Sequence, residues 1–401
     1  MIIKQLFSQW LATLYVGFAS FAVSVFIART VGPATFGEYS LAVATGGILA
    51  VFIDGGMRSL LTREHVRNSQ HLKHLSGQLP WIAFIHALSV TTVASLLAYA
   101  LLRDHLALAL ATIACFFGVT LVQFISAILR GEGRLLADAG WQMGQRTFSA
   151  VCIVSIILLG FDSAWHILVA WTGGSIICVL IFPYGLNGKP LFKFQMSLYR
   201  TTLPLLWISF ATAIYFRSDM IMLQWLGVSQ DEIGQYAAAF RLIEAVILLA
   251  NPLAILLFRR MRKTHDNLEM LGRDIPRAAL LGAFIGLVCV LVFYYLAGPI
   301  VSMTYGSKYP DASTVLIVLS VALVFVLPNA VFTNAALALE LDRPYAWAAS
   351  AAAIVNIVLN FIFIERYGLF AAAWSTIAAE AILMVVLIFA LSVKLKQRGL
   401  Y

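Results

Sequence analysis

Residues 278–301 read AALLGAFIGLVCVLVFYYLAGPIV, a run of 24 residues without a charged side chain. A helix needs about 20 apolar residues to cross the hydrocarbon core of a bilayer, so this stretch predicts a membrane span. The whole 401-residue chain has the same character: 61% of its residues are apolar, 11% are charged, and the mean hydropathy is +0.90. Soluble domains carry roughly 25% charged residues. The composition therefore excludes a soluble enzyme, a disordered chain, a secreted disulfide scaffold and a nucleic-acid-binding protein.

Eleven further stretches have a similar length and hydropathy, and short connections join them. We therefore predict an all-α polytopic membrane protein with twelve transmembrane helices. The predicted spans are residues 8–28, 39–57, 79–102, 106–129, 139–160, 165–184, 202–226, 236–258, 278–301, 313–339, 346–364 and 370–393.

The distribution of the 27 Lys and Arg residues predicts the orientation of these spans. With the N-terminus in the cytoplasm, 20 of them fall in inner loops and 4 in outer loops, while Arg146, Arg217 and Arg241 lie within spans. Cytoplasmic loops of membrane proteins carry such an excess of positive charge. Both termini are therefore predicted to be cytoplasmic.

Three weak sequence matches in the same order suggest an internal repeat. They pair the stretch Gly32…Gly37-Glu-Tyr39 with Gly227…Gly234-Gln-Tyr236, Gly133-Arg134 with Asp342-Arg343, and Gly160…Trp165 with Gly368…Trp374. The offsets predict two six-helix lobes, residues 1–193 and 194–401. Because six is even, the two lobes share one orientation, and rocking them about a shared cavity would give alternating access.

Charged residues within spans are costly, about 2.5–3.5 kcal/mol each on insertion scales, so they are functional candidates. Arg217 and Asp219 are two residues apart and point to different faces of the seventh span, where we expect a cavity-facing role. Arg241 and Glu244 are three apart on the eighth span and can neutralise each other. Matching their depths alternatively pairs Arg217 with Glu244 and Asp219 with Arg241 across the two spans.

Five further polar residues complete the candidate set. Arg146 lies toward the inner end of the fifth span, and Glu380 lies near the middle of the twelfth. Asp54 lies within one turn of the inner end of the second span, where it can cap the helix or pair with Arg58. Asn356 and Asn360 share one face of the eleventh span, for sugar binding or for hydrogen bonds between helices.

Several stretches resemble the polysaccharide flippases of the multidrug/oligosaccharidyl-lipid/polysaccharide (MATE-like) exporter superfamily, the closest being the O-antigen (Wzx-type) flippases. They are RTVGPATFGEY (29–39), FIDGGM (52–57) followed by LTRE (61–64), RSD (217–219) and YGSKY (305–309). The resemblance implies two six-helix lobes around a cationic cavity. It also implies movement of undecaprenyl-diphosphate-linked glycans from the inner to the outer leaflet of the bacterial inner membrane.

For such a substrate we expect the arginines to bind the diphosphate, because guanidinium groups fork onto phosphate oxygens. Arg146 would meet it first, with Arg217 holding it near the midplane and Arg241 as a third ligand. Coupling to H⁺ or Na⁺ would use an acidic residue of a span. Glu380 is the first candidate, ahead of Glu244 and Asp219, and Asp54 is a weaker one. The chain carries no nucleotide-binding loop, and no cofactor is expected.

Membrane lipid and the lipid-linked glycan are the expected partners, with a polysaccharide polymerase and a chain-length regulator downstream. Two other functions stay open. A cation-coupled multidrug exporter would favour an acidic, aromatic cavity. A glycan polymerase or ligase would carry a large outer loop, whereas the longest outer connection here is about a dozen residues, 302–313.

Overall fold

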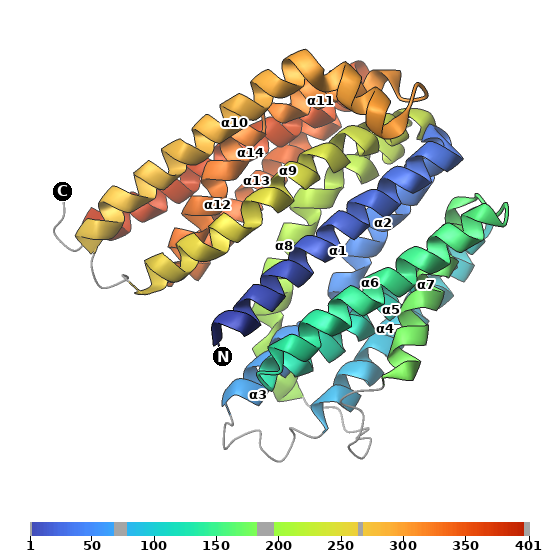
Figure 1. Cartoon of the computed structure of the whole chain (residues 1–401), viewed down its shortest axis with the longest axis horizontal. Helices are drawn as coiled ribbons and strands as arrows, with labels where there is room; N and C mark the ends of the chain where they lie inside the picture. The colour runs from blue at the N-terminus through green and yellow to red at the C-terminus, as the bar shows by residue number, and fades with distance from the viewer. Residues whose placement is uncertain (1, 68–77, 183–195, 264–267, 397–401) are drawn as a thin grey trace. The chain divides into compact units, whose positions relative to one another are not determined.

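The computed structural model describes residues 2–67, 78–182, 196–263 and 268–396, and in these ranges the chain forms helices and no strand. Figure 1 shows their arrangement. In chain order the helices are α1 (Ile2–Val31), α2 (Pro33–Asp54), α3 (Met57–Arg67), α4 (Leu79–Leu101), the 3-10 turn η1 (Arg103–His105), α5 (Leu106–Gly131), α6 (Leu135–Leu158), α7 (Ala164–Ile181), α8 (Met196–Trp225), α9 (Gln230–Lys263), α10 (Leu268–Tyr305), α11 (Pro310–Ser320), α12 (Leu323–Ala338), α13 (Asp342–Tyr367) and α14 (Leu369–Lys396).

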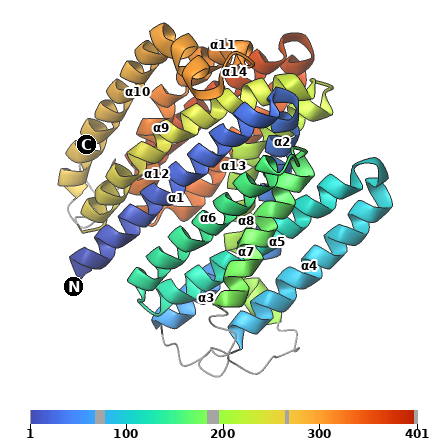
Figure 2. The same cartoon turned by 45° about the vertical axis from the view of Figure 1, so that its right-hand side comes forward.

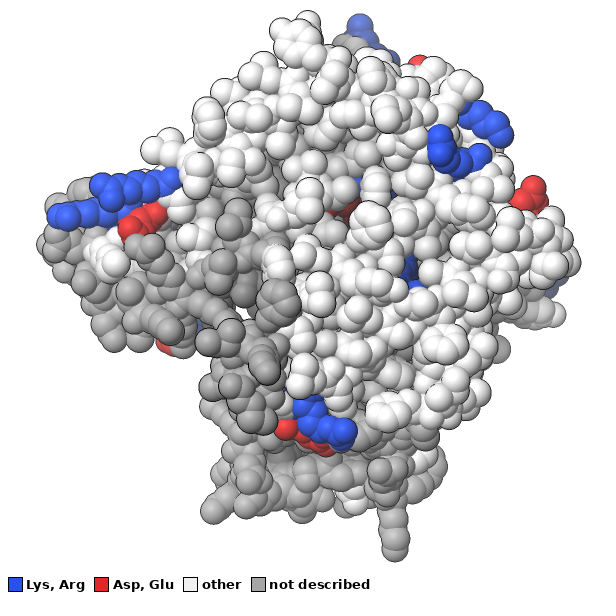
Figure 3. Space-filling view, in the orientation of Figure 1, with Lys and Arg blue, Asp and Glu red and all other residues white. Residues whose placement is uncertain are grey.

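Nine helices of the described chain are long and apolar enough to cross a membrane, and the pair α11–α12, bent by 48°, makes a tenth candidate. The more polar α6 and α8 overlap the predicted spans 139–160 and 202–226. The face drawn in Figure 3 is mostly free of charge, with most charged atoms near its rim. Many large apolar side chains are exposed, among them Leu101, Leu180 and Met303, and such surface suits contact with lipid. The predicted all-α polytopic membrane fold is therefore confirmed, while the number of twelve spans and the position of the termini stay predictions.

The chain divides into two compact units. The first contains Met1–Val31 and Glu38–Ala213. Within it α1 packs along α6, and α5 and α6 both pack against α7, as Figures 1 and 2 show. The predicted lobe boundary between residues 193 and 194 lies outside the described residues, so the boundary stays a prediction.

The second unit contains Gly32–Gly37 and Ile214–Tyr401. Its α13 packs along α14, and α10 packs along α12. Ala348, Ala352 and Ala379 are fully buried in its apolar core. Small side chains let membrane helices approach closely, which increases the van der Waals contact between them.

The repeat motif has a structural basis in its glycines. Gly32 and Gly227, which precede α2 and α9, both have a φ of +82°, a left-handed conformation that favours glycine. At the start of α9, Ser229 and Glu232 form a capping box, in which the Glu232 amide donates to Ser229 Oγ and the Ser229 amide donates to Glu232 Oε2, both at 3.3 Å.

Further along these two helices, Gly37 and Gly234 allow a close backbone contact within the second unit. A Cβ atom added at Gly37 would overlap the Gln230 carbonyl oxygen, and one added at Gly234 would overlap the Pro33 carbonyl oxygen. The glycines of the two Gly-x-Tyr motifs are therefore needed at the contact between the first turns of α2 and α9.

The short helix α3 was not expected from the sequence, which predicted a loop after the second span. Gly55 and Gly56, with φ of +56° and +76°, separate it from α2. Asp54 then caps α3, because its two carboxylate oxygens accept the backbone N–H groups of Gly56 and Arg58, each at 3.1 Å. This break determines where α3 begins, and it places Arg58 in the first turn of that helix.

Candidate functional site

The second unit holds a buried polar cluster centred on Asp219 of α8, whose side chain is 7% exposed. Tyr236 of α9 donates a hydrogen bond to Asp219 Oδ2 at 2.9 Å. Thr376 of α14 donates to the same oxygen at 2.6 Å, and Asn360 of α13 donates to Oδ1 at 2.7 Å. Four helices therefore supply the carboxylate and its three donors.

Asn356 extends this cluster along α13. Its Oδ1 atom accepts hydrogen bonds from Asn360 at 2.9 Å and from Ser218 at 2.8 Å. Asn356 is 1% exposed and Asn360 is fully buried. The predicted common face of the two asparagines is confirmed, and that face meets Asp219.

A second buried carboxylate, Glu380, lies one helical turn from Thr376 on α14. Asn329 Nδ2 donates to Glu380 Oε2 at 2.6 Å and to its backbone oxygen at 2.9 Å, and the Tyr215 hydroxyl donates to Oε1. The residues around Asp219 and Glu380 border one cavity of about 30 Å³. A cavity of this size has room for about one water molecule. Most of its lining is apolar, and the two carboxylates border a space that is too small for a sugar.

The ion pair that the structure gives for the charged residues of α8 and α9 is local to α9. Glu244 Oε2 lies 2.6 Å from Arg241 Nη1 on the same helix, so the local i, i+3 alternative describes this pair. Asp219 accepts from Tyr236, Asn360 and Thr376 instead. The depths matched, but equal depth does not fix the direction in which a side chain leaves its helix. Arg217 is partly buried on α8.

In the first unit, Arg146 of α6 is 8% exposed and stacks on Trp171 of α7, with its guanidinium carbon 5.2 Å from the ring centroid. It borders a cavity of about 290 Å³ that also contacts Arg58 and Arg130. Asp54, predicted as a weak coupling candidate, is the last residue of α2 and makes the contacts described above that cap α3. The first unit therefore contributes a cationic cavity, and the second unit an acidic one.

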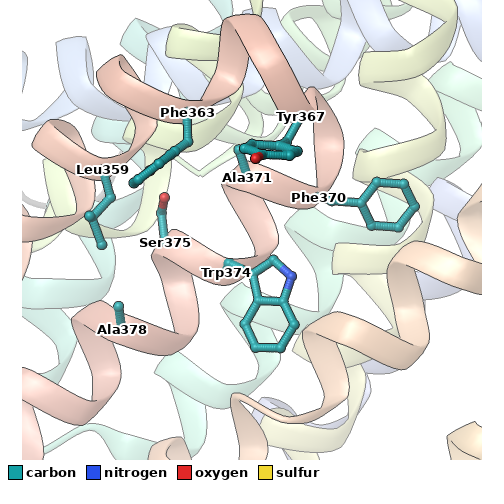
Figure 4. Close-up of a pocket in the computed structure, with 8 residues that line it drawn as sticks. All are labelled: Leu359, Phe363, Tyr367, Phe370, Ala371, Trp374, Ser375 and Ala378. Carbon is teal, nitrogen blue, oxygen red and sulfur yellow. The ribbon is translucent and has the colours of Figure 1, made fainter.

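A third hollow, of about 470 Å³, lies between α13 and α14 (Figure 4). Phe363 and Tyr367 line it from α13, and Phe370, Trp374 and Ser375 line it from α14. None of these side chains is charged and they leave almost no polar surface in the hollow, so it does not suit a charged head group.

Sequence reasoning missed several partners of the predicted residues, namely Tyr215, Ser218, Tyr236, Asn329 and Thr376. For two of these residues the sequence contained a pattern that could have identified them. Tyr236 is the tyrosine of the repeated Gly-x-Tyr motif, and Thr376 lies four residues before Glu380, on the same helical face. The others depend on which helices become neighbours.

The fold is that of a polytopic helical membrane protein, and comparison with known proteins identifies its family. The chain belongs to the polysaccharide biosynthesis protein family, whose model matches residues 2–265. It is 23% identical over 376 residues to a probable low-salt glycan biosynthesis flippase, Agl15, of Haloferax volcanii, covering 89% of this chain and 76% of that protein.

Two solved structures share the fold. The lipid II flippase MurJ in an inward closed conformation matches with a TM-score of 0.79 and 17% identity, covering 97% of this chain and 87% of MurJ. An inward-facing multidrug resistance MATE family transporter of the MOP superfamily matches with a TM-score of 0.75 and 16% identity, covering 97% and 96% of the two chains. These two likenesses show a shared fold, and the family match above confirms the predicted resemblance to polysaccharide biosynthesis proteins.

Proposed function

We propose that this protein moves an undecaprenyl-diphosphate-linked oligosaccharide repeat unit from the cytoplasmic to the outer leaflet of a bacterial inner membrane, as in O-antigen synthesis. Membership of the polysaccharide biosynthesis family supports the substrate class, and so does the similarity to a glycan biosynthesis flippase. A polysaccharide polymerase and a chain-length regulator would act on the delivered unit. Arg217 and Arg241, both partly buried, are proposed as diphosphate ligands in the second unit.

We further propose that transport is coupled to a monovalent cation, H⁺ or Na⁺, at the Asp219 cluster. The observation that carries this proposal is the buried carboxylate of Asp219 with Asn360 and Thr376 in hydrogen-bond contact and Asn356 beside them. A carboxylate buried at bilayer depth is expensive unless a cation or a proton balances its charge. Glu380, on the same 30 Å³ cavity, is the proposed second acid. Asn356 and Asn360 then serve the cation rather than the glycan.

A reconstitution experiment tests both statements. Proteoliposomes would be loaded with a fluorescent undecaprenyl-diphosphate-linked glycan, and its appearance in the opposite leaflet would be followed under imposed Na⁺ or pH gradients. We expect wild-type flipping to respond to one of the two gradients. Asp219→Asn should lower the gradient-driven rate at least tenfold and abolish its dependence on the ion.

Asp231→Asn is the matched control, because Asp231 is an exposed carboxylate at the start of α9. It should behave as the wild type. Gradient dependence that survives in a folded Asp219→Asn protein would contradict the coupling proposal. Wild-type protein that exports cationic dyes and leaves the glycan lipid in place would instead support the multidrug alternative.

A further inference from the structure

The 470 Å³ hollow between α13 and α14 has no role in the proposed transport, although its volume lies within the usual range of ligand pockets, about 300–1,000 Å³. Large side chains spaced four residues apart on one face of α13 line it, namely Leu359, Phe363 and Tyr367. Small side chains line it from α14, namely Ala371, Ser375 and Ala378. Because the side chains of α14 are short, the two helices leave a space that an apolar chain can fill.

The length of the hollow matches one leaflet of a bilayer. Tyr367 is the last residue of α13, and Leu359 lies eight residues earlier, about 12 Å along the helix axis at about 1.5 Å per residue. Half of a hydrocarbon core of about 30 Å is about 15 Å. The hollow begins at the turn between α13 and α14, which the charge asymmetry predicts to be outside. It therefore suits one acyl chain of the outer leaflet and is too short for the much longer undecaprenyl chain.

The mouth of the hollow combines aromatic rings with a cation. Tyr367, Phe370 and Trp374 are exposed there, as aromatic side chains commonly are where a span meets the lipid head groups. The guanidinium carbon of Arg366 lies 5.5 Å from the centroid of the Tyr367 ring. Arg366 is exposed, and so is Glu365, which precedes it and carries the opposite charge. Of these two charges, that of Arg366 lies over a ring that lines the hollow.

We propose that this hollow binds one acyl chain of an anionic membrane glycerophospholipid, with the phosphate of that lipid at Arg366. The walls of the hollow are almost entirely apolar and suit the chain. The guanidinium group at the mouth suits the head group, because phosphate oxygens accept hydrogen bonds from arginine. The lipid is a resident component of the membrane and not the transported substrate, so this site does not rest on the proposed function.

The site adjoins the buried Asp219 cluster. Leu359, on the wall of the hollow, immediately precedes Asn360 in α13. Ser375 likewise precedes Thr376 in α14. Asn360 and Thr376 both donate hydrogen bonds to Asp219. A bound acyl chain therefore packs between the two helices that hold these donors, and it should raise the unfolding temperature of the protein.

The test measures lipid retention on the full chain by native mass spectrometry. The protein would be purified in detergent containing equal amounts of phosphatidylglycerol and phosphatidylcholine with identical acyl chains. Both lipids carry a phosphate, but only phosphatidylglycerol has a net negative charge. We expect the wild type to retain at least threefold more phosphatidylglycerol than phosphatidylcholine. Ala378→Leu places a larger side chain in the hollow, so it should lower the retention of both lipids at least threefold and remove the rise in unfolding temperature that phosphatidylglycerol causes.

Variants of the charged residues test the position of the head group. Arg366→Ala should abolish the preference for phosphatidylglycerol and leave phosphatidylcholine bound. Glu365→Gln removes the opposing charge, so it should keep or increase the preference. Arg103→Ala is the control for charge, since Arg103 is an exposed arginine of η1. Ala390→Leu is the control for size, since Ala390 is another partly exposed alanine of α14 and is not among the described residues that line the hollow. Both controls should behave as the wild type, and thermal unfolding would confirm that every variant is folded.

Three outcomes would overturn the proposal. One is equal retention of the two phospholipids by the wild type, and another is unchanged retention in a folded Ala378→Leu protein. The third is undecaprenyl phosphate that displaces phosphatidylglycerol from the wild type and is itself lost from Ala378→Leu, which would assign the hollow to the tail of the substrate. None of these measurements depends on flipping of a glycan, so failure of the phospholipid site leaves the proposed function in place. Failure of flipping likewise leaves the phospholipid site in place.

Discussion

At the scale of single residues, the pair Arg241–Glu244 shows how little an ion pair reveals about function. Their side chains are 21% and 34% exposed, and the two residues lie one turn apart on α9. Partly exposed pairs of this kind contribute about 0.2–1 kcal/mol, since solvent screens the attraction and ordering two long side chains costs entropy. The pair is therefore compatible with movement of Arg241 toward a substrate.

A double-mutant cycle separates this pair from the one that depth matching suggested. We expect Arg241→Ala and Glu244→Ala to be non-additive in the free energy of unfolding by about 0.2–1 kcal/mol. Arg217→Ala and Glu244→Ala should be less strongly coupled, because Glu244 pairs with Arg241. Coupling between Arg217 and Glu244 that exceeds the coupling between Arg241 and Glu244 would contradict the geometry described here.

At the scale of helices, the contact between the first turns of α2 and α9 depends on two glycines. An added Cβ atom at either position overlaps a backbone carbonyl oxygen. Movement of a side chain therefore cannot relieve the overlap. We expect Gly37→Ala and Gly234→Ala each to destabilise the protein by about 1–3 kcal/mol, the usual cost of overpacking. Thermal unfolding of the purified variants measures the effect.

Gly140→Ala provides the matched control for this prediction. Gly140 lies within α6, and a Cβ atom added there meets nothing within 4 Å. Alanine is the better helix former by up to about 1 kcal/mol, so this variant should be as stable as the wild type or more stable. Equal unfolding temperatures for all three variants would show that the α2–α9 contact tolerates a side chain.

The helices also show what hydropathy can predict. Long uncharged runs such as residues 278–301 lie within helices because a span must satisfy its own backbone hydrogen bonds in lipid. The short polar helix α3 (Met57–Arg67) has no such constraint, so hydropathy gave no signal for it. Its start depends on Gly55, Gly56 and the cap by Asp54, a combination that could equally have formed an open turn.

At the scale of the whole molecule, topology is the main prediction still to be tested. Reporter fusions at Arg103 and Lys308 should lie outside, and those at Lys73 and Lys263 inside, because inner loops carry 20 of the Lys and Arg residues and outer loops carry 4. Fusions with alkaline phosphatase and green fluorescent protein distinguish the two sides. A cytoplasmic reading at Lys308 would mean that a span has been miscounted.

The candidate cation site was predictable in part. Charge within a span identified Asp219 and Glu380, and the i, i+4 spacing placed Asn356 and Asn360 on one face. The contact between Asp219 and Asn360 joins residues 141 positions apart, and that between Asp219 and Thr376 joins residues 157 apart. Periodicity fixes the face of a helix but not the neighbour that the face meets, so these contacts required the structure.

The same separation has a consequence for biosynthesis. Asp219 leaves the ribosome before its partners on α13 and α14 have been made, because 157 residues separate it from Thr376. At about 5–20 residues per second, translation takes roughly 8–31 s to reach Thr376. During that interval Tyr236, only 17 residues later, is the first of its hydrogen-bond donors to be synthesised. The nascent α8 must therefore stay in a hydrated or insertase-protected environment until the last hairpin arrives, which makes release from the insertion machinery a late step in the life of this chain.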